Sequence, residues 1–204
     1  MQTSYITTDF VFAWYKRVEY IWTTWIQYIN TWVSTNWNDN TEMEADIKYY
    51  QTPSENTANW KNEYKWFFMW ITNWNEFYWW AWWYWWFTNV SNDFNKHTFK
   101  IKTSENKLYV DWTWYTFNDN PWSWTIYSWN ISIWATYRPT TNQYEYKSLE
   151  YIYSYKIFKS WTLVRDFRPV YRKSDNVIWL LDIVNKQFYT NSWSWSFTKW
   201  PDVN

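Results

Sequence analysis

Three acidic side chains alternate along one short segment, TEMEADIK, at Glu42, Glu44 and Asp46. Alternate residues of a β-strand face the same side of a sheet, so this spacing gathers three carboxyl groups on one face and apolar residues on the other. Retaining glycoside hydrolysis needs two carboxyl groups about 5 Å apart, and such a face offers that chemistry. The same alternation is also the ordinary pattern of a strand with one side in solvent. We predict the solvated face, no catalytic residue and no enzyme activity.

The single histidine, His97, lies just before a segment with strand character, Thr98–Thr103. Because the chain has no cysteine, His97 cannot complete a zinc site of the usual ligands, and one histidine cannot support a Ser-His-Asp assignment. Asp111, Asp119 and Asp175 lie in predicted turns, but their spacing matches no calcium-binding loop, and Asx turns explain them equally well. We predict a structural hydrogen bond for His97, no metal site and no cofactor, with calcium as an unsupported alternative.

The bulk composition excludes several partners. Lys and Arg together number 19, and so do Asp and Glu, so the chain carries no basic footprint for nucleic acid or for an anionic membrane. The opening residues, MQTSYITTDFVFAWYKR, lack the basic start and apolar core of a signal peptide. No run reaches the roughly 18 apolar residues of a membrane span. We therefore expect neither nucleic-acid binding nor membrane insertion.

Short segments rich in Tyr, Ile, Val, Phe and Thr recur along the chain between clusters of polar turn residues. Several alternate at period two, and we see no capped amphipathic segment of helix length. This pattern predicts an all-β sandwich, formed as one domain over residues 14–204 with a leader or linker at residues 1–13. In the segment Leu149–Phe158, alternation places Leu149, Tyr151, Tyr153, Tyr155 and Ile157 on one face, with Ile152 and Phe158 on the other.

The chain contains 26 Trp and no Gly, although roughly 7% Gly is usual. Tight turns need residues that accept positive φ, which Gly supplies without steric cost. Trp follows Asp or Ser where Asp-Gly or Ser-Gly would form hairpin turns, as at Asp111-Trp112 and Ser160-Trp161. We hypothesise that Trp stands where the parent sequence has Gly, either through a UGA codon translated with the wrong code or through wholesale replacement. The segment YWWAWWYWWF (residues 78–87) is then expected to be a loop between two strands.

With Trp interpreted as Gly, several segments resemble the concanavalin A-like (laminin-G-like) jelly-roll domains of bacterial surface proteins and phage structural proteins. The segment YKRVEYIWTTWIQYINTW at residues 15–32 is similar to the first hairpin of that group, and KLYVDW at 107–112 to its strand and turn LYVDG. ISIWA at 131–135 also resembles a strand of the group. The tail is similar to a C-terminal hairpin common in the group, which implies a hairpin over about residues 165–204. The resemblance spans nearly residues 15–200 and depends on Gly at Trp32, Trp112, Trp134, Trp161 and Trp179.

This resemblance implies an antiparallel jelly-roll β-sandwich. It also implies a non-enzymatic carbohydrate-binding or adhesion module of a phage virion or bacterial surface protein, extracellular or in a larger assembly, with a glycan or a surface protein as partner. A purely structural virion or surface protein with a protein partner is the alternative. A glycoside hydrolase is disfavoured, because glucanases of this superfamily carry a pattern similar to E-x-D-x-x-E, and here Glu42, Glu44 and Asp46 lack the last Glu.

Loops on a rigid sandwich carry function more often than strands do. The predicted ligand-binding residues are therefore those of loop-like segments, namely Tyr78, Tyr84, Asn89, Tyr137 and Arg138.

Overall fold

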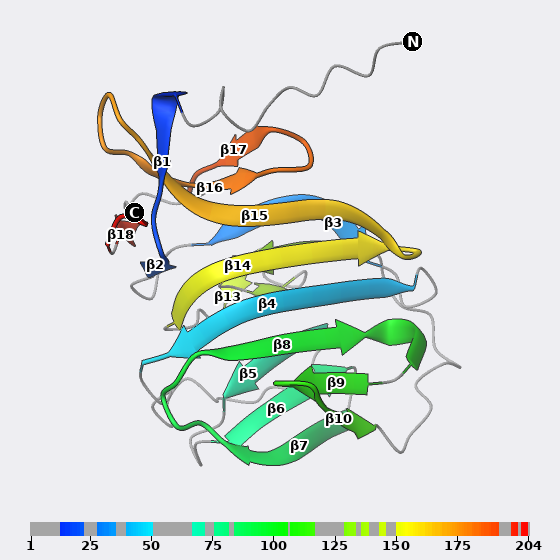
Figure 1. Ribbon diagram of the computed structural model, residues 1–204. Coiled ribbons are helices and arrows are strands. Elements are labelled where there is room, and N and C mark those ends of the chain that lie inside the picture. Colours follow the sequence, from blue (N-terminus) through cyan, green and yellow to red (C-terminus); the bar gives the residue numbers. More distant parts are fainter. Residues whose placement is uncertain are drawn as a thin grey trace.

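The computed structural model describes residues 13–22, 28–35, 40–50, 67–71, 76–81, 84–105, 107–116, 129–133, 136–138, 143–145, 150–191, 197–199 and 201–203. These residues form antiparallel β-strands and the short 3-10 helix η3 (Thr103–Glu105). The predicted all-β class is therefore confirmed (Figure 1). Among the described residues, no helix has the length and apolar character needed to cross a membrane.

The strands range from two-residue edge pieces to long central strands. In chain order they are β1 (Tyr15–Arg17), β2 (Ile21–Trp22), β3 (Ile29–Thr35), β4 (Thr41–Tyr49), β5 (Phe67–Ile71), β6 (Glu76–Ala81), β7 (Tyr84–Ser91), β8 (His97–Lys102), β9 (Lys107–Val110), β10 (Thr113–Thr116), β11 (Trp129–Ile133), β12 (Thr136–Arg138), β13 (Gln143–Glu145), β14 (Glu150–Lys159), β15 (Thr162–Arg172), β16 (Ile178–Asp182), β17 (Gln187–Tyr189) and β18 (Thr198–Lys199).

One large sheet, with the order β10-β9-β8-β4-β14-β15-β16-β17, forms the broad layer nearest the viewer in Figure 1. β1 pairs with β15. β2 pairs with β14, along the same edge of β14 that pairs with β15. The pair β3 with β11, the hairpin of β12 and β13, and the sheet β5-β6-β7 are separate small sheets. They lie largely behind the large sheet, so the strands form two layers (Figure 1).

Segments from opposite ends of the sequence meet at one side of the large sheet. Val18 forms a β-bridge with Asp202, and Thr198 of β18 pairs with Trp22 of β2. Lys16 Nζ donates to Asp202 Oδ2 at 2.8 Å, across a sequence separation of 186 residues. These contacts join residues 16–22 to residues 198–202.

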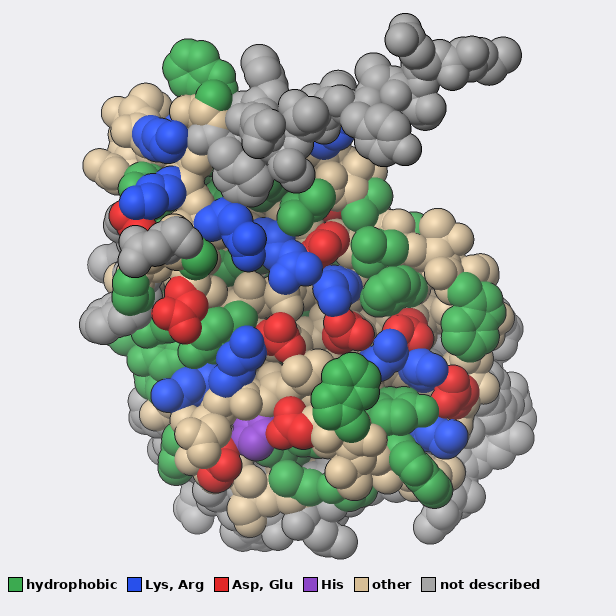
Figure 2. Space-filling model, viewed as in Figure 1, with side chains coloured by type: hydrophobic (Ala, Val, Ile, Leu, Met, Phe, Trp, Pro, Cys, Tyr) green, Lys and Arg blue, Asp and Glu red, His purple; other side chains and the backbone are tan. Residues whose placement is uncertain are grey.

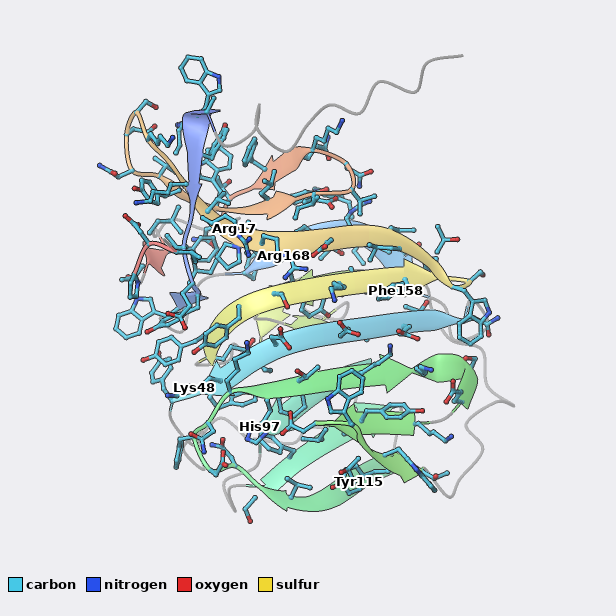
Figure 3. The ribbon with its side chains drawn as sticks, in the orientation of Figure 1. Arg17, Lys48, His97, Tyr115, Phe158 and Arg168 are labelled. Carbon is cyan, nitrogen blue, oxygen red and sulfur yellow. The ribbon has the colours of Figure 1, made fainter. Side chains whose placement is uncertain are left out.

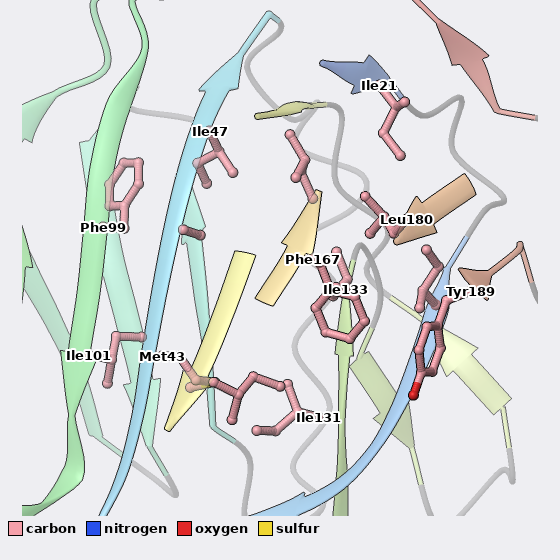
Figure 4. Close-up of a cluster of buried hydrophobic side chains, with 14 of the residues drawn as sticks. Ile21, Met43, Ile47, Phe99, Ile101, Ile131, Ile133, Phe167, Leu180 and Tyr189 are labelled. Atoms are coloured by element: carbon pink, nitrogen blue, oxygen red, sulfur yellow. The ribbon is translucent and has the colours of Figure 1, made fainter. Parts of the chain in front are cut away.

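The core lies between the layers and follows from alternation along the strands. In β4, Met43, Ala45 and Ile47 are buried, while the acidic residues between them stay half-exposed. Figure 4 shows side chains of β4 and β8 in one cluster with Ile131 and Ile133 of β11. Burial of a large apolar side chain stabilises a fold by about 1.5–3 kcal/mol, so this cluster provides the main attraction between the layers.

A β-bulge in β14 changes which residues face the core. The register against β4 shifts by one residue between Ile152 and Ser154. Ile152 and Ile157 are both fully buried on the core side, and Tyr155 also points inward, since its hydroxyl lies 3.3 Å from Met43 Sδ. The strict alternation predicted for this segment was therefore wrong. An extra residue in a strand breaks the two-residue period that the prediction assumed.

Two hairpins of the large sheet turn over two residues whose φ angles are both positive. Asp111 and Trp112 (φ 47° and 74°) connect β9 to β10, and Ser160 and Trp161 (φ 45° and 69°) connect β14 to β15. Such two-residue turns favour Asn-Gly and Asp-Gly, because positive φ is strained for residues with a Cβ. Trp32, inside β3, also has a positive φ of 56°. All three indole side chains are largely exposed.

The segment YWWAWWYWWF is not the loop that the glycine hypothesis predicted. Its residues form the end of β6 and the start of β7, with Trp79 paired to Trp86 and Trp80 to Trp85. The prediction assumed that a run of glycines would interrupt regular structure. Instead, the antiparallel pairing of β6 with β7 extends to both sides of residues 82–83, which lie outside the described part.

An internal ion pair connects the large sheet to β3. Asp182 is fully buried and lies 3.5 Å from Arg165 Nε, which also donates to the carbonyl of Thr31 in β3. The Asp182 carboxylate accepts hydrogen bonds from the backbone N–H groups of Asp166 and Val184 and from the Asn185 side chain. A buried carboxylate needs such complete satisfaction to remain charged.

Candidate functional site

The predicted ligand residues lie in the smaller sheets. Tyr78 is in β6, Tyr84 and Asn89 are in β7, and Tyr137 and Arg138 are in β12. The β6–β7 pairing brings Tyr78 and Tyr84 into one hairpin, while Tyr137 and Arg138 belong to a different sheet. All five are strand residues, although the prediction placed them in loops. Their side chains lie outside the described part of the structure, so their role as ligand residues stays a prediction.

The solvent side of the large sheet, called here the outer face, carries charges of both signs (Figure 2). Glu42 lies 2.5 Å from Lys100 Nζ, and Glu44 lies 2.5 Å from Lys156 Nζ and 3.4 Å from Lys100 Nζ. Asp46 accepts hydrogen bonds from the hydroxyls of Thr98 and Ser154 at 2.7 and 3.0 Å. The three alternating carboxylates are thus the centre of a charge-paired ladder over β8, β4 and β14.

Aromatic side chains gather at the end of the outer face where Lys48 lies (Figure 3). We call this set the tyrosine platform: Tyr20, Trp22, Tyr50, Tyr151 and Tyr153. The Tyr151 ring is the centre, with centroids 4.7 Å from Tyr20, 5.0 Å from Tyr50 and 5.9 Å from Trp22. Tyr153 lies 5.0 Å from Tyr20. Each ring is half-buried, so the platform presents aromatic surface to solvent.

The platform is assembled from three places in the sequence. β2 and β4 both pair with β14 at Tyr151, which lies opposite Trp22 on one side and Lys48 on the other. Tyr50 follows Lys48 by two residues at the end of β4, and the bulge at Tyr153 brings that ring beside Tyr20. The cluster therefore depends on the local irregularity of β14.

The phenol groups of Tyr20, Tyr50 and Tyr153 keep their protons at physiological pH. Burial raises the pKa of Tyr20 to about 12, with smaller contributions from the neighbouring Tyr153, Tyr151 and Glu19. Burial also raises the pKa of Tyr50 and of Tyr153 above the ordinary value of 10.0. Each hydroxyl therefore remains both a hydrogen-bond donor and an acceptor.

Two lysines stand beside the rings. Lys96 Nζ lies 4.7 Å from the Tyr153 ring centroid, a cation–π distance, and 3.9 Å from Asp46. Lys48 lies next to Tyr151 across the β4–β14 pairing and forms no ion pair with any residue that the structure describes. The site thus combines apolar ring faces, neutral hydroxyls and two ammonium groups.

His97 lies near the same end of the sheet and contacts two carboxylates. Its Nδ1 is 2.5 Å from Asp111 Oδ2 and its Nε2 is 2.8 Å from Asp93 Oδ1. Its ring packs against Phe77, with centroids 5.3 Å apart. Desolvation lowers the pKa of His97, but the hydrogen bonds to Asp111 and Asp93 outweigh it, and the net pKa is raised above 6.5. His97 was predicted to form a structural hydrogen bond, and its ring forms two, one to Asp111 and one to Asp93.

A shallow pocket of about 400 Å³ lies between β3 and β17, away from the platform's residues. Its lining includes Asn30, Trp32, Gln187 and Thr190. The pocket is open to solvent and has few enclosing side chains. Across the described ranges, no group of three His, Asp or Glu side chains is arranged to hold a metal ion.

Comparison of the chain with protein-family models, with curated proteins and with solved structures found no match.

The tyrosine platform is a candidate site that the sequence analysis did not identify. Tyr151 and Tyr153 were predicted only to share one face of their strand, and Tyr20 and Tyr50 were not singled out. The i, i+2 spacing of Tyr151 and Tyr153 was the available signal, together with the nearby lysines in LEYIYSYK and DIKYY.

Proposed function

We propose that this chain is a non-enzymatic module that binds carbohydrate through the tyrosine platform. The observation that carries the proposal is the platform itself: neighbouring half-exposed rings around Tyr151, with protonated hydroxyls and lysines at their edge. Apolar C–H faces of a sugar ring pack on aromatic faces, while its hydroxyls need donors and acceptors at the edge. Tyrosine offers both properties in one side chain.

The outer-face carboxylates support a binding function more than a hydrolytic one. Glu42 and Glu44 share Lys100, and Glu44 is also paired with Lys156. A general acid must be within hydrogen-bond reach of the substrate, whereas these carboxylates are already bound to the ammonium groups of the neighbouring lysines. The proposal therefore assigns these residues to the stability of the sheet surface.

The proposal places the module in a concanavalin A-like jelly-roll domain, extracellular on a bacterial surface or within a phage virion. It includes the hypothesis that Trp occupies positions of Gly. Positive φ at Trp32, Trp112 and Trp161 supports that hypothesis. Trp179 lies in β16 without positive φ and gives no such support, and Trp134 is outside the described residues.

A glycan array probed with the purified chain tests the proposal. We expect binding to a defined set of oligosaccharides, reduced about tenfold in Tyr20→Ala and in Tyr50→Ala, since about 1.4 kcal/mol of lost ring contact corresponds to tenfold in affinity. Tyr109→Ala is the matched control, because Tyr109 belongs to β9 and its hydroxyl donates to Glu105. Equal losses in the control and platform variants, with unchanged thermal unfolding, would contradict the assignment.

A structural protein with a protein partner is the second candidate. It is favoured by aromatic rings among the ion pairs of the outer face: Lys107 Nζ lies 5.1 Å from the centroid of the exposed Trp114 ring, and Lys100 Nζ lies 5.8 Å from that of the half-buried Phe158 ring. Absence of glycan binding, with loss of incorporation into the native assembly in Phe158→Ala, would favour this function.

A further inference from the structure

His97 contacts carboxylates through both of its ring nitrogens. A neutral imidazole has one N–H donor and one acceptor nitrogen, whereas an imidazolium has two donors. Because carboxylates only accept hydrogen bonds, the two contacts at 2.5 and 2.8 Å are both favourable only when His97 is protonated. Loss of that proton turns one contact into repulsion between a lone pair and a carboxylate.

The two carboxylates belong to separate segments. Asp111 starts the two-residue turn between β9 and β10, and its other oxygen accepts the backbone N–H of Thr98 at 2.8 Å. Asp93 lies in the connection between β7 and β8, where it accepts the backbone N–H and the side-chain amide of Asn95. Protonated His97 therefore fixes this connection against the β9–β10 turn.

The connection also carries Lys96. Asn92 accepts the N–H of Phe94, which has a positive φ of 60°, so the segment from Asn92 to Asn95 is a tightly folded pair of Asx turns. Lys96 follows directly, with its Nζ above the Tyr153 ring and near Asp46. The position of Lys96 thus depends on the segment that His97 holds.

We infer that His97, in its protonated form, is a positioning residue that holds Lys96 at the edge of the tyrosine platform. The regulatory consequence rests on the proposed carbohydrate function: ligand affinity falls as pH rises and His97 loses its proton. The described charged groups around His97 are Asp93 and Asp111 on its ring nitrogens and Lys96 beside it, with Asp46 of β4 in contact with Lys96. Its other described neighbours, Phe77 and Phe99, are neutral.

NMR of the full chain tests the positioning without any ligand. The side-chain methylene next to Lys96 Nζ experiences the ring current of Tyr153 and gives a shifted signal. We expect that shift to disappear as pH rises from 6 to 9, with the same midpoint as the His97 ring, and to be absent at all pH values in His97→Gln. Asp93→Asn, which removes one of the two charged partners, should lower the midpoint. A Lys96 signal that is unchanged over this range, or that titrates identically in His97→Gln, would overturn the inference.

Binding to an array of neutral and acidic oligosaccharides at pH 6 and pH 8.5 tests the consequence. We expect about fivefold weaker binding by the wild-type chain at pH 8.5, at the lower end of coupling between sites. His97→Gln and Lys96→Ala should bind weakly with little pH dependence, and Lys96→Arg should restore the wild-type behaviour. Failure to bind any oligosaccharide at either pH would refute the proposed function alone, since the NMR result decides the role of His97.

Discussion

Replacement of Trp112 by Gly should stabilise the protein. Asp111 and Trp112 form a two-residue turn with positive φ at both positions, and the Trp112 side chain is 86% exposed. A left-handed conformation costs a residue with a Cβ about 1–2 kcal/mol, and Gly removes that cost. Gly also increases the conformational entropy of the unfolded chain, which offsets about 0.4–1 kcal/mol of the gain. We expect the free energy of unfolding to rise by about 0.8 kcal/mol, the difference between the middle values of these two ranges.

The matched variants separate the backbone effect from the loss of the indole ring. Trp112→Ala removes the ring but keeps a Cβ at positive φ, so it should give no comparable gain. Trp114→Gly lies two residues away in β10, where φ is not positive and Lys107 lies over the ring, so it should destabilise by about 1 kcal/mol. Trp161→Gly should give a smaller gain than Trp112→Gly, because Lys102 Nζ lies 5.8 Å from the Trp161 ring and this contact is lost.

Urea unfolding followed by far-UV circular dichroism and by tryptophan fluorescence measures these differences. Coincident transitions by the two probes are required for a two-state free energy. If Trp112→Ala stabilises as much as Trp112→Gly, the gain comes from removing an exposed ring and the reasoning from φ is refuted. A loss of stability in Trp112→Gly would refute it as well.

Further predictions concern the ion pair between Arg165 and Asp182 and the dependence of the unfolding free energy on pH. Asp182→Ala should lower the unfolding free energy by about 3–5 kcal/mol, because it leaves the guanidinium of Arg165 without its carboxylate partner in the interior. Asp175→Ala is the control. It removes an exposed partner of Arg172 and should change the unfolding free energy little. Hydrogen bonds from Asn95 and His97 lower the pKa of Asp93 from 3.8 to about 2, so the stability that Asp93 contributes is present above pH 4 and lost as the pH falls towards 2. Asp93→Asn should flatten that part of the pH–stability curve, measured by urea unfolding at each pH. The raised pKa of His97 has the opposite sign: its contribution is complete below pH 6.5 and is lost as the pH rises through the folded-state pKa, and His97→Gln should remove that decline.

The sequence predicts the fold class well because the two-residue period is a local property. In β4, each apolar residue between Glu42 and Lys48 is buried and each polar residue stays accessible. The same period misleads in β14, where the bulge at Tyr153 reverses the orientation of the residues that follow it. A bulge is defined by how two strands pair, so it cannot be predicted from the sequence of one strand alone.

The candidate site was not predictable from any single segment. Tyr20, Tyr50 and Tyr151 come from β2, β4 and β14 or their ends, and only the pairing of those strands brings the rings together. His97 shows a similar limit, since Asp111 reaches it through the β8–β9–β10 meander. Predicting either cluster requires the order of strands in the sheet as well as the positions of the strands in the chain.

The pairing of residues 16–22 with residues 198–202 sets an order of events during protein synthesis. Among the residues that the structure describes, β2 pairs with β14 and β18, and Lys16 meets Asp202 only after 186 further residues have been made. At a ribosomal rate of about 5–20 residues per second, Lys16 waits about 10–40 s for Asp202, since 186 residues separate them in the sequence. The rings of Tyr20 and Trp22 meet the Tyr151 ring earlier, once β14 has been made, so this part of the edge forms before the pairing with residues 198–202 completes it.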